Sequence, residues 1–263
     1  MLDALFFVTR ALAFGGLIGF SLGALGAGGS ILTVPILVYA MGVPVQGATG
    51  TSLAIVGLNA ATGAIDYLRR GRSLPKTGIA FGTSGMLGAF AGVWLNHQLR
   101  GELIMVLFAL LMLAAAGSML RRPGVEASGT SVDDRHLVAG WARLVLVGLG
   151  VGFLTGFFGV GGGFLIVPAL VVLLGLPMHL AVGTSLLVIA LNALWGLIGN
   201  LRFGTLDWPL TLLFAIGGVG GVLAGGKLAG RLPDRSLRVA FALLIVGVAV
   251  YTFGRSFGTM LAT

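Results

Sequence analysis

Two glycine runs hold the residues best suited to bind a ligand. They are Gly28-Gly29 and Gly161-Gly162-Gly163, each inside a long apolar stretch. Consecutive glycines weaken a helix, and a half-helix that begins after such a break offers free N–H groups and a positive dipole end to an anion. We therefore assign these runs to substrate binding. The more widely spaced glycines are expected to form stripes for helix packing, namely Gly19, Gly23, Gly26, Gly152, Gly156 and Gly159.

Hydroxyl and amide side chains follow each glycine run. Thr51-Ser52 and Thr184-Ser185 open the next apolar segments, where their hydroxyls either cap a helix N-terminus or donate to an oxyanion. Asn59 and Asn192 lie two turns further on. An amide in hydrocarbon needs partners, so bonding between helices and contact with a substrate are equally good interpretations. We assign these six side chains to substrate binding as well.

The sequence lacks the residue patterns of enzyme, cofactor and metal sites. It has no cysteine, no zinc-ligand spacing, no Ser/His/Asp order, no HExxH, no Walker motif and no dinucleotide fingerprint. Ionisable side chains are few in the apolar segments, and Asp66 and Arg69 lie near the end of one of them. We expect no enzymatic activity, no cofactor and no metal, and we leave the identity of a coupling proton or ion open.

The composition indicates that lipid is the main solvent of this chain. Of its 263 residues 57% are hydrophobic and only 9% are charged, and the mean hydropathy is +1.06. In soluble domains about a quarter of the residues are charged. The formal charge of +8 does not indicate a nucleic-acid partner, because Lys and Arg are confined to short stretches between apolar runs.

Apolar segments divide the chain into two transmembrane parts, residues 1–120 and 143–263, joined by a cytoplasmic linker over residues 121–142. The second apolar segment, Ser30–Met41, is too short to cross a bilayer, which takes about 20 residues. We therefore expect a half-helix or a tilted short helix there. Pro35 in it, and Pro168 in the second part, are expected to bend their helices because proline removes a backbone hydrogen bond. The first five segments are Ala4–Leu25, Ser30–Met41, Gly47–Leu68, Thr77–Leu95 and Leu103–Leu120.

The second part repeats the first at a fixed spacing. The run Gly26-Ala-Gly-Gly-Ser-Ile-Leu-Thr-Val-Pro35 returns as Gly159-Val-Gly-Gly-Gly-Phe-Leu-Ile-Val-Pro168, an offset of 168 − 35 = 133. At the same offset Gly50-Thr51-Ser52-Leu53 matches Gly183-Thr184-Ser185-Leu186. Internal duplication is the usual architecture of secondary transporters, whose sites lie at the interface of the repeats.

These paired segments, with Gly204-Thr-Leu-Asp-Trp208 after the second, resemble the sulfite exporter TauE/SafE family. The resemblance covers nearly the whole chain. It implies the export of sulfite or of a small organosulfonate. The first copy departs from the all-glycine form because Ser30 stands where the second copy has Gly163.

The basic residues favour inverted repeats. An odd number of segments in each copy turns the second copy over, and an even number leaves the copies parallel. Inversion brings all three basic clusters to one side, as expected of cytoplasmic loops, whereas parallel copies would separate the third cluster from the others. The parallel arrangement remains the alternative. The clusters are Arg69–Lys76, the linker arginines Arg121, Arg122 and Arg135, and Lys227–Arg238.

We therefore predict an all-α, multi-pass protein of the bacterial inner membrane with two pseudo-symmetric halves. It is expected to export a small oxyanion, sulfite-like or a sulfonate, by alternating access. The two glycine runs and the two hydroxyl pairs are expected to converge on one central site. A passive anion channel and a membrane scaffold that transports nothing are the alternatives. The oligomeric state and the direction of net transport stay open.

Overall fold

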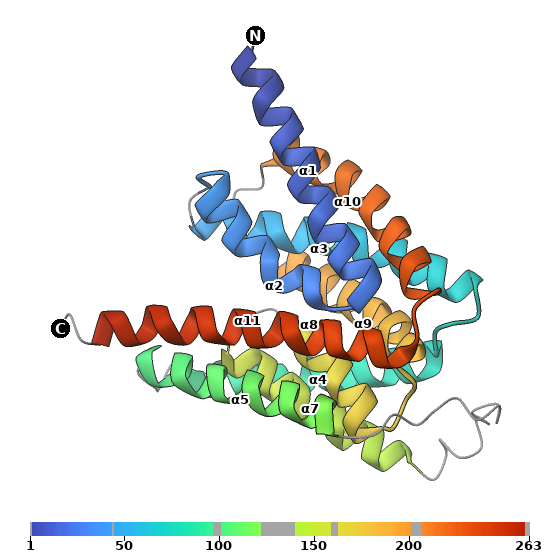
Figure 1. Cartoon of the computed structure of the whole chain (residues 1–263). Helices are drawn as coiled ribbons and strands as arrows, with labels where there is room; N and C mark the ends of the chain where they lie inside the picture. Colours follow the sequence, from blue (N-terminus) through green and yellow to red (C-terminus); the bar gives the residue numbers. More distant parts are fainter. Residues whose placement is uncertain are drawn as a thin grey trace. The chain divides into compact units, whose positions relative to one another are not determined.

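The computed structural model describes residues 2–43, 45–96, 101–121, 140–158, 163–200 and 207–260, and every regular element in these ranges is helical. Figure 1 shows the chain with its helices labelled. In chain order they are α1 (Leu2–Leu25), α2 (Gly28–Pro35), the π-helical segment η1 (Ile36–Ala40), α3 (Val45–Arg69), α4 (Pro75–Asn96), α5 (Gly101–Arg121), α7 (Trp141–Phe158), α8 (Gly163–Pro168), the π-helical segment η2 (Ala169–Leu173), α9 (Met178–Asn200), α10 (Trp208–Ala229) and α11 (Asp234–Met260).

The five apolar segments expected before the linker are all helical and begin and end within a few residues of their expected bounds. Most of the linker, residues 122–139, lies outside the described residues. In the described part of the chain, three helices are long and apolar enough to cross a membrane: Leu5–Leu25, Met178–Ile198 and Trp208–Ala229. The short second segment is residues 28–40, formed by α2 and η1.

Glycines with positive φ end two of these helices. Gly26, at φ 81°, follows α1 and donates its N–H to the carbonyl of Leu22 at 2.8 Å. Gly71, at φ 66°, follows α3 within a Schellman turn, in which Arg72 donates to the carbonyl of Tyr67 at 2.9 Å. A left-handed residue at these places favours glycine. Gly26 therefore ends α1, and its expected place in a packing stripe stays a prediction.

The bounds of several elements recur 133 residues later. The segment η1 (36 to 40) corresponds to η2 (169 to 173), and α4 (75 to 96) corresponds to α10 (208 to 229). Gly42 and Gly175, which follow η1 and η2, both have φ 71°. We call residues that are 133 apart counterparts.

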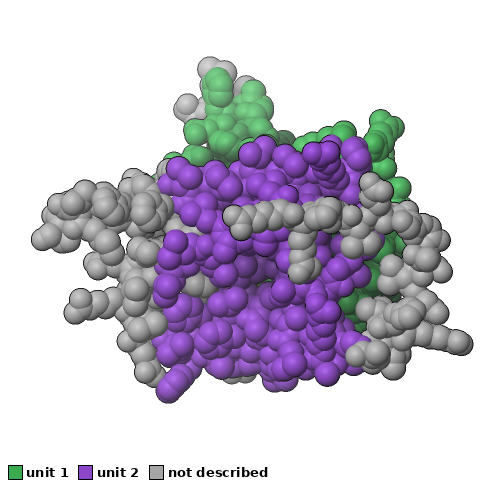
Figure 2. Space-filling view, turned by 60° about the horizontal axis from the view of Figure 1, so that its bottom comes forward, with its two compact units in different colours: residues 1–79, 179–232 green, residues 80–178, 233–263 purple. Residues whose placement is uncertain are grey.

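The described helices form two compact units that do not coincide with the two halves of the sequence. Unit 1 contains residues 1–79 and 179–232, and unit 2 contains residues 80–178 and 233–263. Figure 2 colours unit 1 green and unit 2 purple. Each unit therefore combines helices from the first and from the second half of the chain.

In unit 1, α1 and α10 lie side by side with their backbones in contact (Figure 1). Gly15 faces Phe214, Gly19 faces Gly218 and Gly23 faces Val222. The residue number advances by four on both helices from one contact to the next, so the two helices are parallel. A Cβ atom at Gly19 would lie 2.7 Å from the Cα atom of Gly218, so only glycine fits there. Small residues allow such approach, and van der Waals packing between close backbones stabilises helix pairs in lipid.

In unit 2, α7 and α4 make the counterpart contact. Gly148 faces Phe81, Gly152 faces Gly85 and Gly156 faces Ala89, and each of these six residues is the counterpart of one in the α1–α10 contact. The packing role expected for Gly19, Gly23, Gly152 and Gly156 is thus confirmed, and Gly159 lies outside the described residues. Unit 2 also pairs α5 with α11, and the rings of Phe108 on α5 and Phe164 on α8 meet edge to face at 5.3 Å.

The close α4–α7 contact predicts different effects for two neighbouring glycines of α7. In Gly152→Ala the new methyl group meets the backbone of Gly85, and overpacking of this kind costs about 1–3 kcal/mol. Gly150 has open space around its position, so Gly150→Ala should gain up to about 1 kcal/mol through helix propensity. Thermal unfolding in detergent measures both variants. Equal midpoints for the two proteins would contradict the described packing.

Candidate functional site

In unit 1 the helices α3 and α9 pack against each other. A Cβ atom at Gly63 would lie 3.0 Å from Leu186 Cδ1, one at Gly57 would lie 3.0 Å from Ala193 Cβ, and one at Gly196 would lie 3.2 Å from Leu53 Cδ2. As the residue number falls along α3 it rises along α9. The two helices are therefore antiparallel where they pack.

Asn59 of α3 lies near the centre of this contact and is fully buried (0% exposed). Neither its amide nitrogen nor its amide oxygen has a hydrogen-bond partner among the described residues. The amide lies directly against Gly218 of α10, at the point where Gly218 meets Gly19 of α1. A buried amide without partners costs about 1–3 kcal/mol for each unsatisfied group, so this position is costly for stability.

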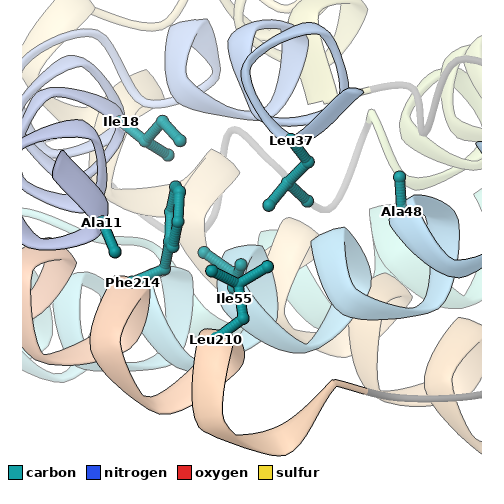
Figure 3. Close-up of a cluster of buried hydrophobic side chains, with 7 residues drawn as sticks. All are labelled: Ala11, Ile18, Leu37, Ala48, Ile55, Leu210 and Phe214. Atoms are coloured by element: carbon teal, nitrogen blue, oxygen red, sulfur yellow. The ribbon is translucent and has the colours of Figure 1, made fainter. Parts of the chain in front are cut away.

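An apolar cluster lies on one side of this amide. Ile55, one helical turn before Asn59, packs there with side chains from α1, η1 and α10, which point toward one another in Figure 3. Such a cluster offers no hydrogen bonds, so it does not satisfy the Asn59 amide. Its buried members are Ala11, Ile18, Leu37, Ala48, Ile55, Leu210 and Phe214.

The C-terminal ends of α1, α3 and α10 meet on the other side of the amide. The hydroxyl of Tyr67 on α3 donates to the carbonyl of Gly23 on α1 at 2.9 Å. A Cβ atom at Gly226 of α10 would lie 3.2 Å from Tyr67 Cε2, and the guanidinium of Arg72 lies against Gly230. Asp66 forms an ion pair with Arg70, one helical turn further on, at 2.9 Å.

This geometry brings two basic clusters to one end of unit 1. Arg69–Lys76 follows α3, and Lys227 and Arg231 belong to the end of α10 that Arg72 contacts. Within unit 1 these two groups of basic residues therefore lie at the same end. The remaining members, Arg235 and Arg238, belong to unit 2.

The two hydroxyl pairs lie at opposite ends of the α3–α9 contact. Thr184 Oγ1 accepts a hydrogen bond at 3.1 Å from the backbone N–H of Leu74, just beyond the C-terminal end of α3. Thr51 lies in the second turn of α3, about 27 Å from that end at 1.5 Å per residue. The prediction that Thr51-Ser52 and Thr184-Ser185 meet at one small anion is therefore wrong. Counterparts on antiparallel helices approach each other only near the crossing point, where Asn59 and the half-buried Asn192 lie.

The expected capping role of these hydroxyls is also wrong. The helices α3 and α9 begin at Val45 and Met178, so Thr51 and Thr184 are inside them. The first N–H of α9 is bonded instead by the carboxylate of Asp234, at 3.0 Å from Met178 N. Ser185 donates to the carbonyl of Val182 at 2.8 Å, within its own helix.

The glycine run at the start of α2 packs against α1. The helix begins at Gly28, and its N-cap residue Ala27 offers no side-chain hydrogen bond. A Cβ atom at Gly29 would lie 2.9 Å from Leu22 Cβ and would contact the carbonyl of Ile18, so α2 folds back closely onto α1. Gly29 therefore has a packing role, and substrate binding at this run stays a prediction.

The counterpart run is only partly described. Gly163 is buried at the start of α8, and Gly161 and Gly162 lie outside the described residues. Pro35 ends α2 and Pro168 ends α8, and each is followed at once by a π-helical segment. The prolines thus mark a change of helix type. A helix with a wider turn accommodates the missing N–H of proline.

Three structural features were missed by sequence reasoning. Gly218 faces the amide of Asn59, and Tyr67 ties α3 to α1. Arg238, expected in a surface connection, is buried in α11 of unit 2. Glycine spacing indicates that a helix has a close partner, but it does not identify the partner. Arg238 lies one turn from the start of α11, and the apolar run Val239-Ala-Phe-Ala-Leu-Leu244 follows it directly in the sequence.

The chain resembles known proteins along almost its whole length. A family model described as "Sulfite exporter TauE/SafE" matches residues 11–252. A probable membrane transporter protein of Xylella fastidiosa is 35% identical over 251 residues, which cover 94% of this chain and 95% of that protein. The probable membrane transporter protein YdhB of Bacillus subtilis is 30% identical over 227 residues, which cover 86% and 92% of the two chains. No solved structure matches the chain.

The contact between Gly218 and Asn59 predicts coupled effects of substitution. In Gly218→Ala the methyl group displaces the amide, at a cost of about 1–3 kcal/mol. In an Asn59→Ala background the obstacle is gone, so the same change should cost much less. Gly220→Ala, which has open space around it, is the matched control on α10. Additive losses in thermal stability would show that the amide does not lie against Gly218.

Proposed function

The chain belongs to the sulfite exporter TauE/SafE family of membrane transporters, and from this premise we propose that it is a secondary transporter that exports a small anion, sulfite or an organosulfonate, across the bacterial inner membrane by alternating access. The family supports the transport of a substrate. The mechanism and the site of transport rest on the arrangement of unit 1.

The observation that supports the mechanism is a symmetric pattern of contacts between α3 and α9. The contact of Gly63 with Leu186 and the contact of Leu53 with Gly196 are made by counterparts, because Gly63 corresponds to Gly196 and Leu53 to Leu186. A two-fold axis across an antiparallel helix pair produces such a symmetric pattern. The pattern supports the proposal that two copies of a five-helix unit are inverted in the membrane. Inverted repeats are a common basis of alternating access.

The substrate site proposed here is centred on Asn59 and Asn192. They are counterparts near the crossing point of α3 and α9, where an axis of this kind passes. The buried Asn59 amide has unused donors, which suit the oxygens of sulfite or a sulfonate. A neutral amide binds an anion less tightly than a fixed cation does, which allows release on the far side. The runs Gly28-Gly29 and Gly161–Gly163 remain further candidate donors.

Flux into proteoliposomes tests the proposed function. Purified protein should give saturable movement of sulfite, or of a short alkanesulfonate, that depends on an imposed gradient. A conductance that does not saturate would indicate a channel instead. If neither anion moves, and a cooperative thermal unfolding transition shows that the protein is folded, the result would indicate a scaffold and contradict the proposal.

Asn59→Leu is expected to separate function from stability. It removes a buried amide that has no partner, so the protein should become more stable by about 1–3 kcal/mol. It also removes a hydrogen bond to a charged substrate, worth roughly 1.5–3 kcal/mol, so the affinity for the anion should fall about 10- to 150-fold. Thr62→Val on the same helix is the control, because the Thr62 hydroxyl is bonded locally to the Leu58 carbonyl. A variant that is less stable and still transports normally would identify Asn59 as structural.

A further inference from the structure

The hydrogen bond between Thr184 and Leu74 ties the turn after α3 to the first turns of α9. The N–H of Leu74 donates to Thr184 Oγ1 at 3.1 Å, and Thr184 is fully buried. Gly183, the preceding residue, packs against the carbonyl of Arg72 and the ring of Tyr67. The Schellman turn at Gly71 holds this connection in place. The contact therefore closes the end of unit 1 that carries the basic residues.

The counterparts of these two residues are Thr51 and Asp207, at the other end of α3. Leu74 precedes α4 and Asp207 precedes α10, and these two helices begin alike. The N–H of Gly78 donates to the Leu74 carbonyl and the N–H of Thr211 donates to the Asp207 carbonyl, both at 2.9 Å. Thr51 is as buried as Thr184. Its hydroxyl nevertheless has no hydrogen-bond partner among the described residues. The bond from Leu74 to Thr184 is therefore made. The equivalent bond from Asp207 to Thr51 is not made, and its acceptor, the Thr51 hydroxyl, is buried and unsatisfied.

We propose that these two threonines form alternating latches: the Thr184–Leu74 bond closes the basic end in the state described here, and the Thr51–Asp207 bond closes the opposite end in the other state. This inference rests on the proposed function, because inverted repeats exchange their conformations when access alternates. A buried hydroxyl without a partner destabilises the present state. That cost keeps the two states close in free energy, as a transporter that cycles between them requires.

Single cysteines make the two ends observable, because the chain has no cysteine of its own. Ser73→Cys reports on the basic end, since Ser73 is buried beside Leu74. Ala48→Cys reports on the other end, one turn before Thr51, and Ala48 is also buried. The probe is a small, charged methanethiosulfonate reagent, applied to protein in lipid nanodiscs that expose both faces. The quantity measured is the labelling rate at each position.

The latch predicts opposite responses at the two ends. Thr184→Val removes the acceptor of Leu74, so labelling of Ser73→Cys should become about tenfold faster and labelling of Ala48→Cys slower. Thr51→Val removes only the alternative bond, so Ser73→Cys should be labelled no faster than before. Thr184→Ser keeps the hydroxyl and should restore the original rates. This rescue separates the latch from a general loss of folding.

Two results would overturn the latch: faster labelling at both ends in Thr184→Val, or no change at either end. Labelling needs no substrate, so it is independent of the flux measurement. If no anion moves while the opposite responses persist, the proposed function fails and the conformational exchange stands. If sulfite flux is intact and both valine variants transport normally, the latch fails and the proposed function stands.

Discussion

The antiparallel contact of α3 with α9 is the constraint on which the rest of unit 1 depends. Glycines at 57, 63 and 196 let the two helices approach closely, and the contacts on one side of the crossing are repeated by counterparts on the other. This arrangement decides which residues can share a ligand. Counterparts near the crossing, such as Asn59 and Asn192, come to the same level, and counterparts far from it, such as Thr51 and Thr184, are carried to opposite ends. The glycine contacts of α1 with α10, and of α4 with α7, then pack helices from different halves of the chain against each other.

The helices and their approximate bounds were predictable from the sequence, because apolar runs bounded by charge, glycine or proline are a local property. The packing role of Gly19 and Gly152 was predictable for the same reason. The division into units was not, because the partner of α1 is α10, almost two hundred residues later, and glycine spacing does not identify a partner. The convergence of Thr51 with Thr184 was expected from inverted repeats alone. It fails because counterparts on two antiparallel helices come together only near their crossing point, and the sequence does not show where α9 crosses α3.

Stability and transport place different demands on the polar groups of unit 1. Most buried polar groups in proteins are paired, and Thr184, Ser185 and Tyr67 follow this rule. Asn59 and Thr51 do not follow it within the described residues. A ligand or a second conformation is the proposed source of the missing partner. Asn59 near the crossing point fits the first explanation, and Thr51 at the end of the contact fits the second.

Cross-linking of cysteine pairs at four positions tests the inverted arrangement most directly. Cysteines can replace Leu53, Gly63, Leu186 and Gly196 two at a time in a chain that has no cysteine of its own. The antiparallel contact predicts that the pairs 53 with 196 and 63 with 186 are joined by a short thiol-specific cross-linker, and that 53 with 186 and 63 with 196 are not. Cross-linking of the second two pairs in place of the first would show parallel repeats and contradict the account.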